Sequence, residues 1–189
     1  MQYLLTPQAT PIPPYVWWDG AFSENELNWL QEKAKLAKNN SHVLGGVNQN
    51  VRKSQTEWLN FSKEAEFVFK KLADVTSYFN ANFFQFDLDG FGEPLQLTNY
   101  NQEDNGMYVW HQDYGAPVSR KLSLVLQLTD PSEYEGGNLQ VLTEEHPSTI
   151  KKQRGLIVGF PSYILHQVTP VTKGSRQSLV AWLSGPKFK

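Results

Sequence analysis

The chain of 189 residues contains no cysteine, which excludes disulfides and every zinc site built on thiolates. It also lacks any apolar run of the roughly 18 residues that a membrane-spanning helix needs. The first residues, Met1-Gln-Tyr-Leu-Leu-Thr-Pro7, have neither the basic region nor the long apolar stretch of a secretory signal. A chain without cysteine is compatible with a reducing compartment, and we expect a cytoplasmic protein.

An excess of charge of either sign is absent as well. Lysine and arginine number 17 and aspartate and glutamate 19, so the formal net charge is −2. This balance gives no electrostatic case for nucleic acid or an anionic membrane as a partner. Hydrophobic residues make up 40% of the chain, which is enough to bury a core, and the length fits one domain.

Helices are expected in the first half of the chain. Ser23-Glu-Asn-Glu26 is a capping box, in which the side chains of Ser23 and Glu26 satisfy backbone amides at a helix start. We expect one helix over residues 24–38 and a second, with apolar residues at helical spacing, over residues 62–82. Residues 7–14 contain four prolines and indicate an extended leader.

Strands are expected at the start and throughout the second half. After residue 83 the sequence consists of short alternating or apolar runs separated by Gly, Pro and Asp. We expect strands at residues 16–18, 95–100, 107–113, 121–128, 138–142, 155–160 and 177–184. So many short strands predict a mainly β sandwich or jelly roll. Residues 1–83 would then be a leader with supporting helices, and residues 84–189 the jelly-roll core of a single domain.

One of these strands, residues 121–128, has leucine at every second position. We expect Leu122, Leu124 and Leu126 to face a pocket inside the fold. Ser123 and Gln127 would then face outward.

Two sequence positions carry the residues of a possible metal site. His111 and Asp113 are separated by one residue, so on a strand their side chains point to the same face. His166 can be a third ligand if the fold brings a second strand alongside. Two imidazoles and one carboxylate form the facial triad of non-haem Fe(II) oxygenases, which leaves coordination positions open. His42 and His146 lie in polar regions and are expected to be solvated, without a ligand role.

A possible carboxylate site follows the third histidine. Arg176 and Ser178 lie ten and twelve residues after His166 and share a strand face. A guanidinium binds a carboxylate through two parallel hydrogen bonds, and a hydroxyl can add a third. A dicarboxylate oxo-acid can therefore chelate the metal at its keto-acid end and place its far carboxylate on Arg176 and Ser178. Val180 and Trp182, further along this face, would be apolar walls of the pocket.

Further motifs carry a family resemblance. They are Leu122-Ser-Leu-Val-Leu-Gln-Leu-Thr-Asp130, Tyr134-Glu-Gly-Gly-Asn-Leu139, Gly155-Leu-Ile-Val-Gly-Phe-Pro161 and His166-Gln-Val-Thr-Pro-Val171. With the residues above, they resemble the 2-oxoglutarate and Fe(II)-dependent dioxygenases. Within these, the chain is most similar to the prolyl 4-hydroxylase-like branch, which includes the bacterial and phage PKHD-type hydroxylases. The resemblance covers roughly residues 95–185 and implies a double-stranded β-helix, or jelly-roll, core.

The resemblance also implies roles for individual residues. His111, Asp113 and His166 would be the iron ligands. Arg176 would anchor the far carboxylate of 2-oxoglutarate, where many animal and plant prolyl 4-hydroxylases have a lysine. Tyr100 is similar in position to a tyrosine whose hydroxyl contacts the co-substrate, although this match is looser.

The implied activity is that of an oxygenase. The cofactors would be Fe(II), 2-oxoglutarate as co-substrate and O2, with ascorbate as a further candidate. The reaction would convert 2-oxoglutarate to succinate and CO2 and hydroxylate a C–H bond, by resemblance that of a prolyl residue in a peptide or protein. Three alternatives stay open: the same chemistry on a free amino acid or other small metabolite, a cupin-like metal enzyme, and a non-catalytic jelly roll that binds metal or ligand.

Substrate contacts are expected from aromatic and basic residues and from polar loops. The candidates are Arg52, Trp58, Tyr108 and Trp182, each of which can equally be an ordinary packing residue. The Asn- and Gly-rich residues 39–55 predict a mobile loop that orders over the site when a peptide binds. The polar residues 101–106 are a second loop from which specificity can come.

Overall fold

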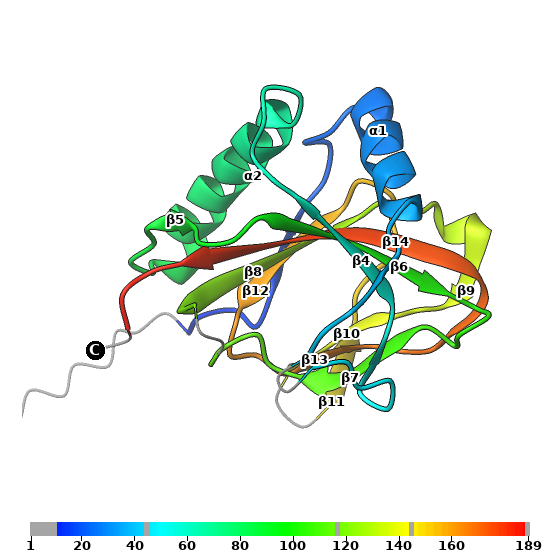
Figure 1. Cartoon of the computed structure of the whole chain (residues 1–189). Coiled ribbons are helices and arrows are strands. Elements are labelled where there is room, and N and C mark those ends of the chain that lie inside the picture. Colours follow the sequence, from blue (N-terminus) through cyan, green and yellow to red (C-terminus); the bar gives the residue numbers. More distant parts are fainter. Residues whose placement is uncertain (1–10, 44–45, 116–117, 144–145, 188–189) are drawn as a thin grey trace, which may run out of the picture.

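Two antiparallel β-sheets lie face to face, and two helices cover the outer face of the larger sheet (Figure 1). The computed structural model describes residues 11–43, 46–115, 118–143 and 146–187. Residues 1–10, which include the first half of the expected leader, lie outside this described part. The architecture is mainly β with N-terminal helices and a double-stranded β-helix core, which confirms the fold that the sequence predicts.

The larger sheet supports both helices. Its strands are, in spatial order, β1 (Val16–Trp18), β12 (Ile157–Pro161), β8 (Arg120–Gln127), β14 (Val171–Ser184), β6 (Leu95–Asn101), β4 (Gln55–Leu59) and β2 (Asn39–Asn40). Two short strands, β5 (Gly90–Phe91) and β9 (Tyr134–Gly136), pair with β14. The long strand β14 is therefore the centre of this sheet and carries both residues of the expected carboxylate site.

The smaller sheet lies on the side of the larger sheet away from the helices (Figure 1). Its strands are β11 (His146–Thr149), β10 (Leu139–Thr143), β13 (His166–Val168), β7 (Met107–His111) and β3 (Arg52–Lys53). The short 3-10 helix η2 (Pro131–Glu133) precedes β9. Because β7 and β13 are neighbours, the sheet places the two sequence regions of the expected metal site side by side.

Residues 39–55 contain more regular structure than the loop that the sequence predicts. Strand β2 pairs with β4, β4 pairs with β6, and β3 pairs with β7. Each of these short strands forms because it pairs with a partner strand, and its own composition does not predict a strand. Residues 44–45 of this segment lie outside the described residues.

The first helix begins at its expected start signal, whereas the second begins at Glu66 rather than at residue 62, and the Ser62 hydroxyl accepts from the Ala65 amide in the turn before it. Helix α1 (Glu24–Lys35) has the expected capping box: the Ser23 amide donates to the Glu26 carboxylate at 2.7 Å, and the Glu26 amide donates to the Ser23 hydroxyl at 3.5 Å. Helix α2 (Glu66–Phe79) continues into a π-helical turn, η1 (Asn80–Phe84). Among the described residues, no helix is long and apolar enough to span a membrane.

The faces of strand β8 are the reverse of those expected. Leu122, Leu124 and Leu126 pack in the core between the larger sheet and the helices. Ser123 faces the space between the two sheets, where it contacts the expected metal site, and Gln127 is buried instead of facing outward. The prediction was wrong because both faces of β8 are covered, so the position of the leucines could not show which face borders the pocket.

Candidate metal and co-substrate site

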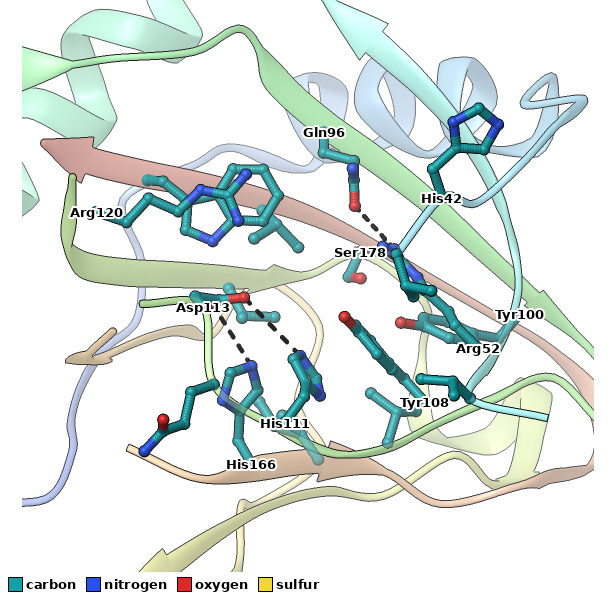
Figure 2. Close-up of a pocket in the computed structure, with 18 of the residues that line it drawn as sticks. His42, Arg52, Gln96, Tyr100, Tyr108, His111, Asp113, Arg120, His166 and Ser178 are labelled. Carbon is teal, nitrogen blue, oxygen red and sulfur yellow. Dashed lines mark hydrogen bonds and ion pairs between the residues drawn. The ribbon is translucent and has the colours of Figure 1, made fainter. Parts of the chain in front are cut away.

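The structure brings His111, Asp113 and His166 together at one end of the smaller sheet (Figure 2). His111 is the last residue of β7 and lies directly opposite His166, the first residue of β13. One potential ligand atom from each of the three residues lies within 4.8 Å of the others. The Nε2 atoms of His111 and His166 are 3.8 and 3.6 Å from the Asp113 carboxylate. These separations fit three donors around one metal ion.

Both imidazoles present the same nitrogen to this centre. The Nδ1 atom of His111 is 2.8 Å from the Val109 carbonyl, and that of His166 is 3.0 Å from the Ile164 carbonyl. A carbonyl only accepts hydrogen bonds, so each Nδ1 carries a proton, and in a neutral ring Nε2 is then the nitrogen with the lone pair. Burial, followed by the nearby His166, lowers the pKa of His111 to about 3. His111 is therefore neutral near pH 7, which is the form that binds metals.

The Asp113 carboxylate is buried and held by hydroxyl groups. The Ser123 hydroxyl donates to Asp113 Oδ2 at 2.7 Å and lies 2.9 Å from the Ser162 hydroxyl. Burial alone would raise the pKa of Asp113, but the two imidazoles, the Ser123 hydroxyl and the indole of Trp182 outweigh it and lower the pKa. Asp113 is thus ionised, oriented and ready to act as a ligand.

Arg176 and Ser178 form a second group of donors in the same cavity. Arg176 is only 2% exposed, and its Nη1 lies 3.4 Å from the Ser178 hydroxyl. Tyr100 lies opposite Arg176 on the neighbouring strand, with its ring 5.5 Å from the guanidinium carbon. Among the described residues, no group accepts a hydrogen bond from Arg176 Nη2, and no carboxylate pairs with the guanidinium.

The unpartnered Nη2 and the lack of a described carboxylate partner indicate an anionic ligand, because a buried donor without an acceptor is costly. The backbone leaves little free space on one side of it: a side chain at Gly137, which has φ +58°, would approach Arg176 Cδ to 3.1 Å. The space that a ligand could occupy lies on the side of the guanidinium that borders the cavity. A carboxylate in that space would accept hydrogen bonds from Arg176 Nη2 and from the Ser178 hydroxyl.

One cavity of about 630 Å³ joins the two groups of donors. Its volume is typical of pockets that bind small ligands. The triad, Tyr100, Arg176 and Ser178 all line it, and so do apolar side chains from both sheets: Val125, Leu139, Val168 and Val180. A molecule in the cavity can therefore reach the metal ligands at one end and the guanidinium at the other.

The aromatic candidates for substrate contact also line this cavity. Trp58 is 41% exposed and Trp182 is 5% exposed, and their ring centroids are 6.2 Å apart. Tyr108 is stacked on His111, and burial raises its pKa to about 12, so its phenol is neutral. Arg52 also lines the cavity but is buried, with hydrogen bonds to Ser54 and Gln96. The structure thus gives Arg52 packing partners as well as access to the cavity.

Several further residues line the cavity without a prior sequence signal, among them Arg120, Glu93 and His42. Arg120 forms two hydrogen bonds, at 2.5 and 2.7 Å, with the Glu93 carboxylate and lies 3.8 Å from the Trp182 ring. His42 is exposed as expected, but it belongs to the rim of the cavity. Glu93 and Arg120 meet only through tertiary structure, since 27 residues separate them.

The expectation that residues 101–106 contribute to specificity is not supported. None of them lines the cavity with the triad. Residues 103–105 instead line a smaller polar hollow together with residues of β3 and β4. The turn is directed away because β6 and β7, which it connects, belong to different sheets.

Comparisons with known proteins agree with this site. Residues 95–184 match the family model of the 2OG-Fe(II) oxygenase superfamily. A PKHD-type hydroxylase of Prochlorococcus marinus is 45% identical over 78 residues, which are 40% of this chain and 35% of that protein. A PKHD-type hydroxylase of Synechococcus is 38% identical over 101 residues, which are 50% and 45% of the two chains. The match thus spans less than half the length of these relatives.

Similarity in structure extends over most of the chain. A Pseudomonas putida prolyl-4-hydroxylase aligns with a TM-score of 0.75 at 19% identity, covering 90% of this chain and 92% of the other. A Trichoplax adhaerens prolyl hydroxylase, in complex with a hypoxia inducible factor peptide fragment, aligns with a TM-score of 0.77 at 14% identity, covering 91% and 84%. At these identities the similarity shows a shared fold. Residues 95–184, just under half of the chain, are thus similar to the 2OG-Fe(II) oxygenase superfamily, and this stretch contains the His-Asp-His triad.

Proposed function

We propose that this protein is an Fe(II)- and 2-oxoglutarate-dependent dioxygenase that hydroxylates a prolyl residue in a peptide or protein. One observation carries the proposal. The triad of potential metal ligands and the buried guanidinium of Arg176, which no described carboxylate pairs with, line the same cavity. A keto-acid with a second carboxylate is the kind of molecule that satisfies both ends.

His111, Asp113 and His166 would hold the iron through two Nε2 atoms and one carboxylate oxygen. When bound, iron with 2-oxoglutarate and O2 supplies the oxidation: one oxygen atom enters succinate as CO2 leaves, and the other becomes the product hydroxyl. The Ser123 hydroxyl keeps Asp113 Oδ2 engaged, so that Oδ1 is the freer oxygen. The apolar side chains Val125, Leu139, Val168 and Val180 in the lining would limit the access of water to this chemistry.

Arg176, Ser178 and Tyr100 would bind the far carboxylate of 2-oxoglutarate. Arg176 offers its unpartnered Nη2 together with Nη1, and the planar guanidinium can bind both oxygens of a carboxylate at once. The Ser178 hydroxyl adds a donor beside Nη1. The proposed role of Tyr100 in binding this carboxylate rests on its position opposite Arg176 in the larger sheet.

A peptidyl proline as substrate is supported by the cavity mouth and by the structural neighbours. Trp58 and Trp182 offer aromatic surface, on which an apolar proline ring packs well. Tyr108 and Arg52 also line the cavity and are the further candidates for substrate contact. The neighbours of known structure include prolyl hydroxylases, one of them described with a bound peptide fragment.

The proposal extends to the organisation of the chain and to its surroundings. We propose a single oxygenase domain, because strands β1 to β4, from before residue 84, complete both sheets. Ascorbate is proposed as an accessory reductant on the family resemblance alone. A cytoplasmic location is proposed because a reducing compartment preserves Fe(II). Neither a cupin-like enzyme nor a non-catalytic jelly roll accounts for the unpaired Arg176 in the cavity.

The test is succinate formation from 2-oxoglutarate against a panel of proline-containing peptides and free amino acids. We expect Fe(II)-dependent succinate formation that a proline peptide stimulates, with one added oxygen atom on that peptide by mass spectrometry. Stimulation by a free amino acid and by none of the peptides would contradict the peptidyl substrate. Succinate formation at the level of a metal-free sample would contradict the oxygenase itself.

A further inference from the structure

One metal-ligating residue of the proposed site is stacked face to face on a tyrosine. The rings of Tyr108 and His111 have centroids 3.4 Å apart and planes inclined by only 15°. The guanidinium of Arg52 lies 4.7 Å from the centroid of the same Tyr108 ring. Figure 2 shows Tyr108 between Arg52 and His111. The three side chains form a continuous stack that ends at the metal site.

The outer member of this stack is itself fixed. Arg52 is 7% exposed. Its Nε donates to the Ser54 hydroxyl at 3.0 Å, and its Nη2 donates to the side-chain oxygen Oε1 of Gln96 at 2.8 Å. Gln96 lies on β6 of the larger sheet, whereas Arg52 lies opposite Tyr108 in the smaller sheet. Arg52 therefore ties the stack to both sheets, and its guanidinium is not free to move away from Tyr108.

The stack gives His111 a face-to-face restraint, which its tilted contact with the His166 ring, at 4.1 Å and 54°, does not provide. Its hydrogen bond from Nδ1 to the Val109 carbonyl fixes one edge of the imidazole, but the ring can still tilt about that contact. Contact with the flat face of Tyr108 opposes this tilt. The other two members of the triad have their own supports, since Asp113 accepts from Ser123 and the His166 ring packs 4.6 Å from Phe160.

We infer that Tyr108 is a positioning residue for His111, that its ring rather than its hydroxyl performs this role, and that Arg52 holds it in place. The inference rests on the proposed function, because it takes His111 as a metal ligand. It has a consequence for residues 39–55: strand β3, which belongs to this segment, contributes to metal binding before any substrate arrives.

The test is a titration with Co(II), without 2-oxoglutarate or substrate, followed by the visible d–d absorption that reports ligand geometry. Tyr108→Leu removes the ring, and we expect Co(II) affinity to fall about tenfold, with a changed spectrum. Tyr108→Phe keeps the ring, and we expect affinity within about twofold of the wild type and the same spectrum. Arg52→Met keeps a long apolar side chain without the charge, and a loss of about fivefold is expected.

Tyr15→Leu is the matched control. Tyr15 and Tyr108 are both partly buried and pack on the same hydrophobic cluster, but Tyr15 is not in contact with the triad in any described ring pair. We expect this variant to bind Co(II) as the wild type does. Thermal unfolding of each variant shows whether the fold is retained.

Three results would overturn the inference: wild-type affinity and spectrum in Tyr108→Leu, an equal loss in Tyr108→Phe, or an equal loss in Tyr15→Leu. If Tyr108→Leu does not fold, Arg52→Met carries the test, and unchanged Co(II) binding there overturns it. Failure of the metal site itself is distinguishable. Undiminished Co(II) binding by His111→Ala, or no binding by the wild type, would refute the proposed function together with this inference.

Discussion

Replacing Arg176 with alanine removes the proposed anchor of 2-oxoglutarate. The guanidinium is 2% exposed, and its Nη2 has no acceptor among the described residues. Because the position is buried, water in Arg176→Ala cannot readily take over the hydrogen bonds to the far carboxylate of 2-oxoglutarate. Loss of a buried partner of a charged group costs about 2–5 kcal/mol. The lower value corresponds to about 30-fold in affinity. We therefore expect the KM for 2-oxoglutarate to rise about 30-fold or more in Arg176→Ala.

The assay is succinate formation against 2-oxoglutarate concentration, with Co(II) affinity measured in parallel. Arg176→Lys is expected to be intermediate, because one ammonium cannot reproduce two parallel hydrogen bonds. Lys173→Ala is the matched control: it removes a cation from the same strand, but Lys173 is exposed and paired with Glu135. We expect the control to leave the KM unchanged and Arg176→Ala to leave Co(II) affinity nearly unchanged. An unaltered KM for 2-oxoglutarate in Arg176→Ala would refute the reasoning.

Three further predictions concern the metal, the fold and the loop. Ser123→Ala removes the hydrogen bond to Asp113 Oδ2, and Co(II) titration should show an affinity about tenfold lower; equal affinity would mean that this hydroxyl does not orient the carboxylate. Burial opposes ionisation of Glu26, but the ion pair with Lys71 and the capping box outweigh burial and lower the pKa of this carboxyl below its usual 4.5. The ionised carboxylate therefore stabilises the fold above pH 4.5, and this stabilisation is lost as the pH falls through the lowered pKa. Glu26→Gln should therefore lower the Tm at pH 7, and the difference from the wild type should shrink below about pH 4.5; a difference independent of pH would contradict this. Limited proteolysis with inert metal and 2-oxoglutarate should cut residues 39–55 less once a turnover-supporting peptide is added, whereas equal cleavage would show that this segment is not the gate.

Much of the fold could be predicted because local signals determine it. The capping box at Ser23 and Glu26 predicts the start of α1, since both of its hydrogen bonds form within one turn. The spacing of His111 and Asp113 predicted that both would reach one site, but the strand ends at His111, and Asp113 lies in the bend after it, where its amide donates to the Ser162 carbonyl. These two residues meet His166 because β7 pairs with β13. The family resemblance implied this ligand set, whereas the spacing of the residues along the sequence did not.

The remaining features depend on contacts that leave no local pattern. Both faces of β8 are buried, one by the helices and one by the smaller sheet, so the sequence did not show that Ser123 borders the metal site. The polar residues of β3 and β4 are strands because β7 and β6 offer them free edges. Arg120 and Glu93 pair across 27 residues, and nothing near either residue predicts the other.

The central claim is that His111, Asp113 and His166 hold the iron that couples 2-oxoglutarate to hydroxylation. The most direct measurement is Fe(II)-dependent succinate formation by the wild type and by His111→Ala, Asp113→Ala and His166→Ala, each checked for folding by thermal unfolding. We predict turnover in the wild type and none above the metal-free background in any of the three folded variants. Wild-type turnover in any one of them would contradict the account.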